Sequence, residues 1–348
     1  MGVYLNPGSE MFEQSLNSEI YVDKTGLIEQ TNRCFKSQQK YLCVSRPRRF
    51  GKTMAADMLC AYYDRTVDGA ALFRGLAIEQ AESFARNRNS CDVIRLNMQE
   101  FLSETKSVEE LLAFLQEALL WEMLQEYPDF TYFRKGSLRH VMETIHQNTR
   151  RPFVIVIDEW DCIFREYPHD TAAQRQYLDF LRDWLKDKAY IGLAYMTGIL
   201  PIKKYGTHSA LNMFREFSMA DPRQFAPFVG FMEDEVKALC SRYGMDFAEC
   251  RSWYDGYHFA ESGAVYSPKS VVEAMLSKSY GSYWNRTETY EALKVYIDLN
   301  HEGLRDAVVR MMGGGRQRIA TGNFANDMTT HFCRRCDDSA RAFGLPRL

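Results

Sequence analysis

The sequence has almost no net charge and no long hydrophobic run. Its 43 Lys and Arg residues and 46 Asp and Glu residues leave a formal charge of −3 over 348 residues, which gives no general electrostatic reason to bind nucleic acid or a membrane. The longest strongly apolar stretch is "FVIVI", whereas a membrane-spanning helix needs ~20 such residues. The N-terminus lacks a charged start followed by an apolar run, so we expect no signal peptide and a cytoplasmic protein.

Disulfide and zinc patterns are also absent. The nine cysteines are scattered, and Cys43, Cys60 and Cys162 have apolar neighbours in the sequence. This usage is typical of small buried thiols in a reducing compartment. The segment "HFCRRC" could supply half of a zinc site, but no second Cys/His pair at ligand spacing accompanies it. We therefore expect no structural metal.

Apolar strands alternate with helical patterns over the first two thirds of the chain. The strands are expected at 40–45, 92–98, 152–161 and 191–200, and this alternation favours a parallel α/β sheet. From "DPRQF" onward the apolar strands stop and short helical patterns follow. We expect three parts: a P-loop domain at 1–220, a smaller, mainly helical subdomain at 221–310, and a linker and tail at 311–348.

The stretch "VSRPRRFGKTM" (44–54) ends as a phosphate-binding loop does but lacks its first glycine, where Arg46 stands. Because Arg46 precedes a proline, its backbone is pushed towards an extended conformation, and the strand should run through it. The phosphate cradle must then come from the amides after Pro47. The predicted nucleotide-binding residues are Arg48, Arg49, Phe50, Gly51, Lys52 and Thr53.

Each of these residue types has a physical reason to lie there. Gly51 lets the backbone approach a phosphate closely, Lys52 reaches the β- and γ-phosphates, and the Thr53 hydroxyl binds Mg²⁺. Arg48 and Arg49 can contact phosphate, a partner or nucleic acid, or can simply be solvated. A basic turn without a ligand is the alternative for the loop as a whole.

A second motif favours the nucleotide site over that alternative. The strand "VIVIDE" ends in Asp158 and Glu159, and acids at the end of a buried strand are costly unless they have a function. We expect a strand next to the loop's own strand to bring Asp158 to Mg²⁺, and Glu159 to orient and polarise the attacking water. Thr197 ends the fourth strand and is a candidate γ-phosphate sensor. Asp161 either assists at Mg²⁺ or caps a turn.

Seven motifs, in this order, carry a family resemblance over roughly residues 5 to 328. They are "YVDKTGLI", "RPRRFGKT", "VIVIDEWD", "TGIL", "SALN", "WYDGYHF" and "YSPKSVV". The chain resembles the predicted AAA-ATPase-like family of bacteria, in which the loop takes the form "RPRRFGKT". The resemblance implies Walker A roles for Lys52 and Thr53 and Walker B roles for Asp158 and Glu159. For "WYDGY" the residues themselves suggest aromatic packing.

Members of that family often carry a C-terminal nuclease domain of the PD-(D/E)XK superfamily, and its acid and lysine motif is not found here. The resemblance implies DNA or RNA as partners only through that nuclease domain. We further expect the tail after about Thr330 to arise from a reading-frame change. Codons chosen for 336–347 and read one base later encode "AMTLLVHLGYL", which nearly restores the helix with which family members continue.

These observations predict a P-loop ATPase of the additional-strand (ASCE, AAA-like) type that binds ATP and Mg²⁺. Three alternatives stay open: an ATP-dependent switch with negligible turnover, a nucleic-acid-binding module using "RPRR", and a kinase of a small substrate. Glu159 argues against a pure switch, and the near-neutral charge weakens the nucleic-acid module. The sequence leaves open whether copies of the chain form a homo-oligomer.

Overall fold

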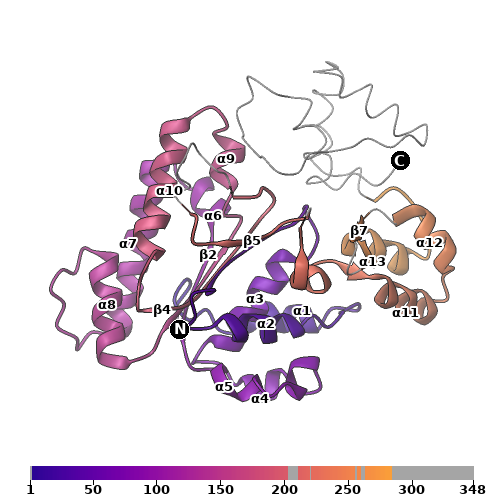
Figure 1. The fold of residues 1–348 in the computed structure, drawn as a ribbon, viewed down its shortest axis with the longest axis horizontal. Coiled ribbons are helices and arrows are strands. Elements are labelled where there is room, and N and C mark those ends of the chain that lie inside the picture. The colour runs from indigo at the N-terminus through magenta and orange to yellow at the C-terminus, as the bar shows by residue number, and fades with distance from the viewer. Residues whose placement is uncertain (1, 203–210, 220, 255–256, 260–262, 284–348) are drawn as a thin grey trace. The chain divides into compact units, whose positions relative to one another are not determined.

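Five strands form a parallel sheet in the order β2-β3-β4-β1-β5 (Figure 1). The computed structural model describes residues 2–202, 211–219, 221–254, 257–259 and 263–283. The strands are β1 (Tyr41–Ser45), β2 (Asp92–Asn97), β3 (Phe153–Asp158), β4 (Ile191–Gly198) and β5 (Arg215–Phe217). Every residue of β1, β3 and β4 is buried, because helices cover both faces of a parallel sheet. The predicted α/β fold is confirmed.

Helices α6 to α10 lie on one side of the sheet and α1 to α3 on the other (Figure 1). The apolar face of α10 formed by Tyr177, Leu181, Trp184 and Leu185 is buried. On α3, Met58, Leu59 and Tyr62 are buried, whereas Met54 is 41% exposed. The helices of this part are α1 (Glu10–Leu16), α2 (Gly26–Cys34), α3 (Lys52–Tyr63), α4 (Gly69–Leu72), η1 (Ala77–Gln80), α5 (Phe84–Asn87), α6 (Met98–Ser103), α7 (Val108–Glu126), α8 (Leu138–Thr149), α9 (Cys162–Glu166) and α10 (Thr171–Leu185).

Contacts divide the chain into two units. The first contains residues up to 45, 52–202 and the described residues up to 217, and the second contains 46–51 and the described residues from 218 on. The second unit holds η2 (Arg223–Phe228), β6 (Phe231–Met232), α11 (Glu233–Tyr243), α12 (Phe247–Tyr254), β7 (Tyr257–Phe259), β8 (Gly263–Tyr266) and α13 (Pro268–Ser277). Helices α11 and α13 lie where the sequence shows short helical patterns, whereas α12 was not expected. Its three short antiparallel strands, in the order β6-β8-β7, were not expected.

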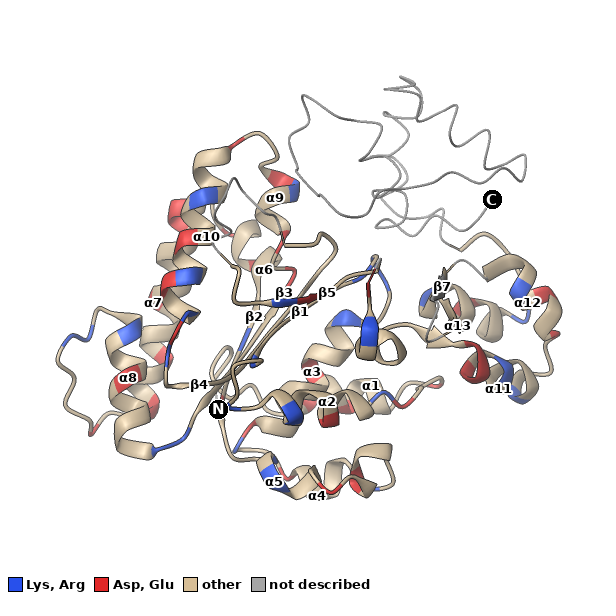
Figure 2. Cartoon of the chain, in the orientation of Figure 1, with Lys and Arg blue, Asp and Glu red and all other residues tan. Residues whose placement is uncertain are grey.

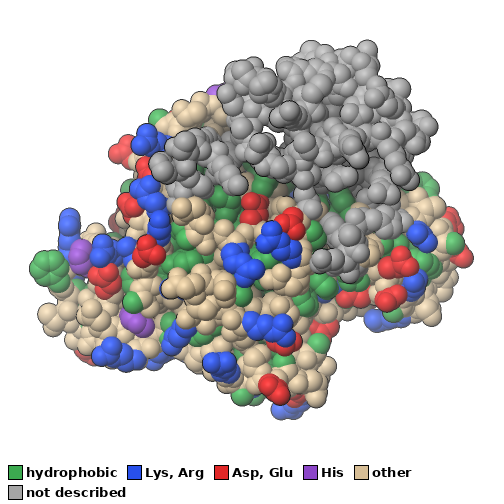
Figure 3. All heavy atoms as spheres, viewed as in Figure 1, with side chains coloured by type: hydrophobic (Ala, Val, Ile, Leu, Met, Phe, Trp, Pro, Cys, Tyr) green, Lys and Arg blue, Asp and Glu red, His purple; other side chains and the backbone are tan. Residues whose placement is uncertain are grey.

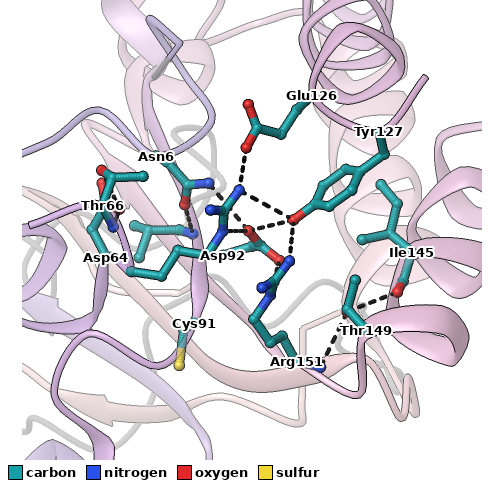
Figure 4. A network of polar contacts seen from close by, with 12 residues as sticks. Asn6, Asp64, Thr66, Cys91, Asp92, Glu126, Tyr127, Ile145, Thr149 and Arg151 are labelled. Atoms are coloured by element: carbon teal, nitrogen blue, oxygen red, sulfur yellow. Dashed lines mark hydrogen bonds and ion pairs between the residues drawn. The ribbon is translucent and has the colours of Figure 1, made fainter. Parts of the chain in front are cut away.

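Asp92, at the amino end of β2, is the centre of a buried polar network (Figure 4). Its Oδ1 accepts hydrogen bonds from Arg65 Nε (2.7 Å), Tyr127 Oη (2.7 Å) and Asn6 Nδ2 (3.1 Å). Its Oδ2 lies 3.4 Å from Arg151 Nε. Burial and the adjacent Asp92 raise the pKa of Tyr127 to about 12, so the phenol keeps the proton that it donates. The network joins β2, α7 and the start of β3.

A segment before α1 pairs antiparallel with β2, at one edge of the sheet. The Arg95 amide donates to the Tyr4 carbonyl (2.9 Å). The buried carboxylate of Glu122 in α7 accepts from the three consecutive amides of residues 3–5, at 2.7, 3.0 and 2.6 Å. One acid therefore holds this segment against the edge strand.

Two predictions fall outside the described residues: the linker and tail at 311–348 and the reading-frame change after about Thr330. In the part of the chain that the structure describes, no helix has both the length and the apolarity to cross a bilayer. The seven cysteines in that part are buried and unbridged.

Candidate nucleotide-binding site

The two predicted motifs meet at the carboxyl ends of the strands. Thr53, at the start of α3, donates its hydroxyl to Oδ2 of Asp158, the last residue of β3, over 2.7 Å. The expectation of adjacent strands was wrong, because β4 lies between β1 and β3. That intervening strand is the additional strand of the predicted fold type. Residues 105 positions apart in the sequence thus share one site.

The loop between β1 and α3 turns through left-handed backbone twice, at Arg49 (φ 66°) and at Gly51 (φ 85°). A Cβ added at Gly51 would meet no atom within 4 Å, so backbone conformation rather than lack of space requires glycine there. Phe50 is buried and packs edge-on against Tyr257, with ring centroids 5.7 Å apart. Tyr257 is the last residue of "WYDGY", so this motif supplies aromatic packing for the loop.

Glu159 follows Asp158 in left-handed backbone (φ 51°). Its Oε2 accepts a 2.6 Å hydrogen bond from Arg165 in α9. The fully buried Asp161 accepts from the amides of Ile199 (3.1 Å) and Leu200 (2.8 Å), just beyond β4. Asp161 therefore fixes the chain after β4 in this structure.

Thr197 lies in β4, between the strands of the two motifs. Its buried hydroxyl donates to the Val44 carbonyl of β1 over 3.1 Å, and its sensor role stays a prediction. At Gly198, the next residue, an added Cβ would lie 2.5 Å from Asp161 Oδ1 and 2.7 Å from Trp160 Cδ1. Only glycine fits there without displacing both side chains.

Burial shifts the titration of several groups here. It raises the pKa of Asp158, which the Thr53 hydrogen bond opposes, and it raises those of Asp161 and Asp57. Burial lowers the pKa of Lys52, against the attraction of the neighbouring acids. Acids and a lysine held together where burial disfavours their charged forms are typical of a functional site.

Sequence reasoning missed two members of this constellation. Arg165 lies four positions after Asp161, and this i,i+4 spacing is a sequence signal for an ion pair on a helix. Its spacing of six positions from Glu159 is not one at which helical residues are neighbours. Arg95 in β2 pairs with the buried Asp57 of α3 over 2.6 Å. That pairing depends on how the helix lies on the sheet, so the sequence alone carries no signal for it.

Comparison with known protein families identifies the family of this chain. A family model described as predicted AAA-ATPase matches residues 8–207, which include both motifs and all of β1 to β4. The chain belongs to the predicted AAA-ATPase family. The expected family resemblance is therefore confirmed.

A curated relative of this AAA-ATPase-like chain is an uncharacterized protein in the vnfD 5' region of Azotobacter chroococcum mcd 1. It is 27% identical over 284 residues, which cover 77% of this chain and 51% of the relative. The chain thus spans about half the length of that relative.

Two solved structures are also similar to the chain. The Aeropyrum pernix ORC2 protein has a TM-score of 0.35 and 11% identity, covering 96% of this chain and 83% of that one. C. elegans PCH-2 has a TM-score of 0.31 and 11% identity, covering 69% and 52%.

Proposed function

We propose that this chain binds Mg²⁺-ATP at the carboxyl ends of β1 and β3 and hydrolyses it to ADP and phosphate. The observation that carries the proposal is the hydrogen bond between Thr53 and Asp158 (2.7 Å). A hydroxyl and a carboxylate in contact are the oxygen donors that Mg²⁺ prefers. Among the described residues, no group of three His, Cys, Asp or Glu side chains could hold a metal. Phosphate oxygens and water would therefore complete the coordination.

The proposed roles in binding and hydrolysis fall to different residues of the site. The backbone amides of residues 48–53 bind phosphate oxygens, and the buried Lys52 places its charge beside them. Bound Mg²⁺ would supply charge neutralisation between the phosphates. Glu159 orients the attacking water and accepts its proton. Thr197, from β4, is proposed to report on the γ-phosphate.

Binding and turnover are tested separately. Lys52→Ala should abolish Mg²⁺-dependent ATP binding measured by calorimetry, whereas Lys106→Ala, which removes an exposed lysine, should bind as the wild type does. Glu159→Gln should keep ATP affinity and slow turnover by roughly 10²–10³-fold, as expected for a group acting on the reacting water. Equal ATP affinity in the wild type and Lys52→Ala would refute the site. Unchanged turnover in Glu159→Gln would favour an ATP-dependent switch or another base.

Charge on the surface gives little support to a nucleic-acid module. Figure 2 shows acidic and basic residues side by side on α10 and α11, where Arg182 pairs with Asp179 and Lys237 with Glu233. On the face that Figure 3 shows, both signs are interspersed over the described part of the chain. Coupling to a nuclease-like domain rests on the family resemblance alone. Sequencing the gene beyond codon 330 tests it, since one shifted frame should encode such a domain.

A further inference from the structure

Arg165 contacts the side chains of two acids at the proposed site. One terminal nitrogen donates to Glu159 Oε2 over 2.6 Å, and Nε lies 3.5 Å from Asp161 Oδ2. The side chain is only 14% exposed, that of Glu159 is 23% exposed and that of Asp161 is fully buried. Water therefore screens these charges weakly, and the geometry is held more firmly than in an exposed ion pair.

Asp161 connects Arg165 to the backbone beyond β4. Its Oδ2 accepts from the amides of Ile199 and Leu200 at 3.1 and 2.8 Å. Burial raises the pKa of Asp161, and the charge of Arg165 opposes that shift. Arg165 thus helps to keep Asp161 ionised, and ionised Asp161 holds the two amides more strongly.

Only one oxygen of Glu159 is engaged. Oε2 is held by Arg165, whereas Oε1 has no hydrogen-bond partner among the described residues. The left-handed backbone at Glu159 (φ 51°) turns the chain so that its side chain meets an arginine six positions ahead. A carboxylate with one oxygen fixed and one available is suited to orient a water molecule.

We propose that Arg165 is a positioning residue that fixes Glu159 for its action on water, and that Asp161 anchors Arg165 to the segment after β4. The proposal rests on the proposed ATPase function and assigns a role to a residue outside both motifs. Arg165 acts through Glu159 and need not touch ATP. The opposite arrangement, in which Arg165 withholds Glu159 from the site, predicts faster turnover when the arginine is removed.

The kinetic test compares Arg165→Ala and Arg165→Lys with Arg139→Ala, which breaks an exposed 2.9 Å pair with Glu143 on α8. Loss of a group that orients another typically costs roughly 10–100-fold in activity. We expect Arg165→Ala to lose that factor in kcat while its KM and calorimetric affinity for Mg²⁺-ATP stay within about threefold of wild type. Arg165→Lys should recover part of kcat, and Arg139→Ala should match the wild type.

A double variant separates positioning from damage to the fold. If Arg165 acts only through Glu159, Glu159→Gln/Arg165→Ala should be no slower than Glu159→Gln. Structural damage would instead add to the loss in the double variant, and that result overturns the proposal. Without nucleotide, amide exchange at Ile199 and Leu200 should speed up in Arg165→Ala. Unchanged exchange there overturns the anchoring by Asp161.

The outcomes distinguish the two proposals. Wild-type or faster turnover in Arg165→Ala overturns the positioning role alone and leaves the ATPase function standing. Absence of Mg²⁺-dependent turnover in the wild type overturns the proposed function and the positioning role with it. Thermal melts of every variant identify any that fail to fold; if Arg165→Ala does, the kcat of Arg165→Lys relative to the wild type decides.

Discussion

The two ends of β2 and β3 hold buried acids in opposite circumstances. At the amino end, Asp92 accepts three hydrogen bonds and lies beside two arginines. At the carboxyl end, burial raises the pKa of Asp158 and of Asp161. Among the residues that the structure describes, the Oδ1 atom of Asp161 has no hydrogen-bond partner. The same sheet therefore carries a satisfied polar network at one end and a strained one at the other.

The difference fits a structural role for the amino end and the ligand-binding role that is proposed for the carboxyl end. A buried acid surrounded by donors stabilises the fold that orders them. Where burial disfavours the charged form of an acid, binding of a cation beside it stabilises that charged form most. Loss of charge should therefore have opposite effects on stability at the two ends.

The largest effect is expected for Asp92→Asn, at the amino end. The change removes the anion that faces Arg65 and Arg151. Breaking a buried pair costs about 3–5 kcal/mol, and because these arginines are 22% and 35% exposed we expect about 2–3 kcal/mol of lost unfolding free energy in urea. The site lies five residue steps away along β2, roughly 16 Å, so ATP affinity should not change.

A matched control is Asp179→Asn on α10, since Asp179 pairs with exposed arginines. Its effect should stay within about 0.5 kcal/mol. Equal losses in the two variants would show that the Asp92 network contributes no more than a surface pair does.

A smaller effect of opposite sign is expected for Asp158→Asn without ligand. An asparagine can still accept from the Glu159 amide through Oδ1 and can donate to Thr53 through Nδ2, so both contacts of Asp158 survive. The buried charge is lost, and we expect Tm to rise by roughly 2–4 °C, about 1 kcal/mol for a domain of ~200 residues. Mg²⁺-dependent ATP turnover should fall sharply. A lower Tm would contradict the idea that this end is held under electrostatic strain.

The smallest expected effect is the pH dependence of the difference in stability between Asp158→Asn and the wild type. The pKa of Asp158 is raised above its ordinary 3.8 in the folded chain, so the fold favours its neutral form. Its stabilising contribution is complete below pH 3.8 and is lost as the pH rises through the raised pKa. The stability gain of Asp158→Asn should therefore be greatest near pH 7 and shrink as the pH falls towards 3.8, measured by urea unfolding at several pH values. If the stability gain of Asp158→Asn does not change with pH, the gain comes from packing rather than from loss of the charge.

The sheet and the two motifs were predictable because their signals are local. The strands at 41–45 and 153–158 are continuous apolar runs, and each is followed at once by its polar motif. The start of α7 has the Ser107 and Glu110 spacing of a capping box, and only half of that motif forms. Ser107 accepts from the Glu110 amide, but the Glu110 carboxylate accepts from the Lys106 amide rather than from that of Ser107.

What escaped prediction depends on contacts between distant or irregular segments. The Arg165–Glu159 pair requires left-handed backbone at Glu159, which nothing in "DEWD" indicates, because an acid followed by tryptophan favours no such turn. Strands β6 and β8, of two and four residues, are too short to show alternation. Phe50 was predicted as a nucleotide-binding residue of the loop, and its packing against Tyr257 was not foreseen because it joins residues more than two hundred positions apart.

The pairing of residues 4–6 with β2 also bears on association between molecules. An open edge strand offers its amides and carbonyls to any other chain, which makes it a starting point for aggregation. Here the chain covers its own edge, and the Glu122 carboxylate holds the cover by three amides. Neither Glu122 nor the three amides that it accepts from belong to the proposed site. Solubility at high concentration and ATP turnover should therefore be separate properties of this protein. A change at Glu122 would lower the solubility and leave the ATP turnover intact.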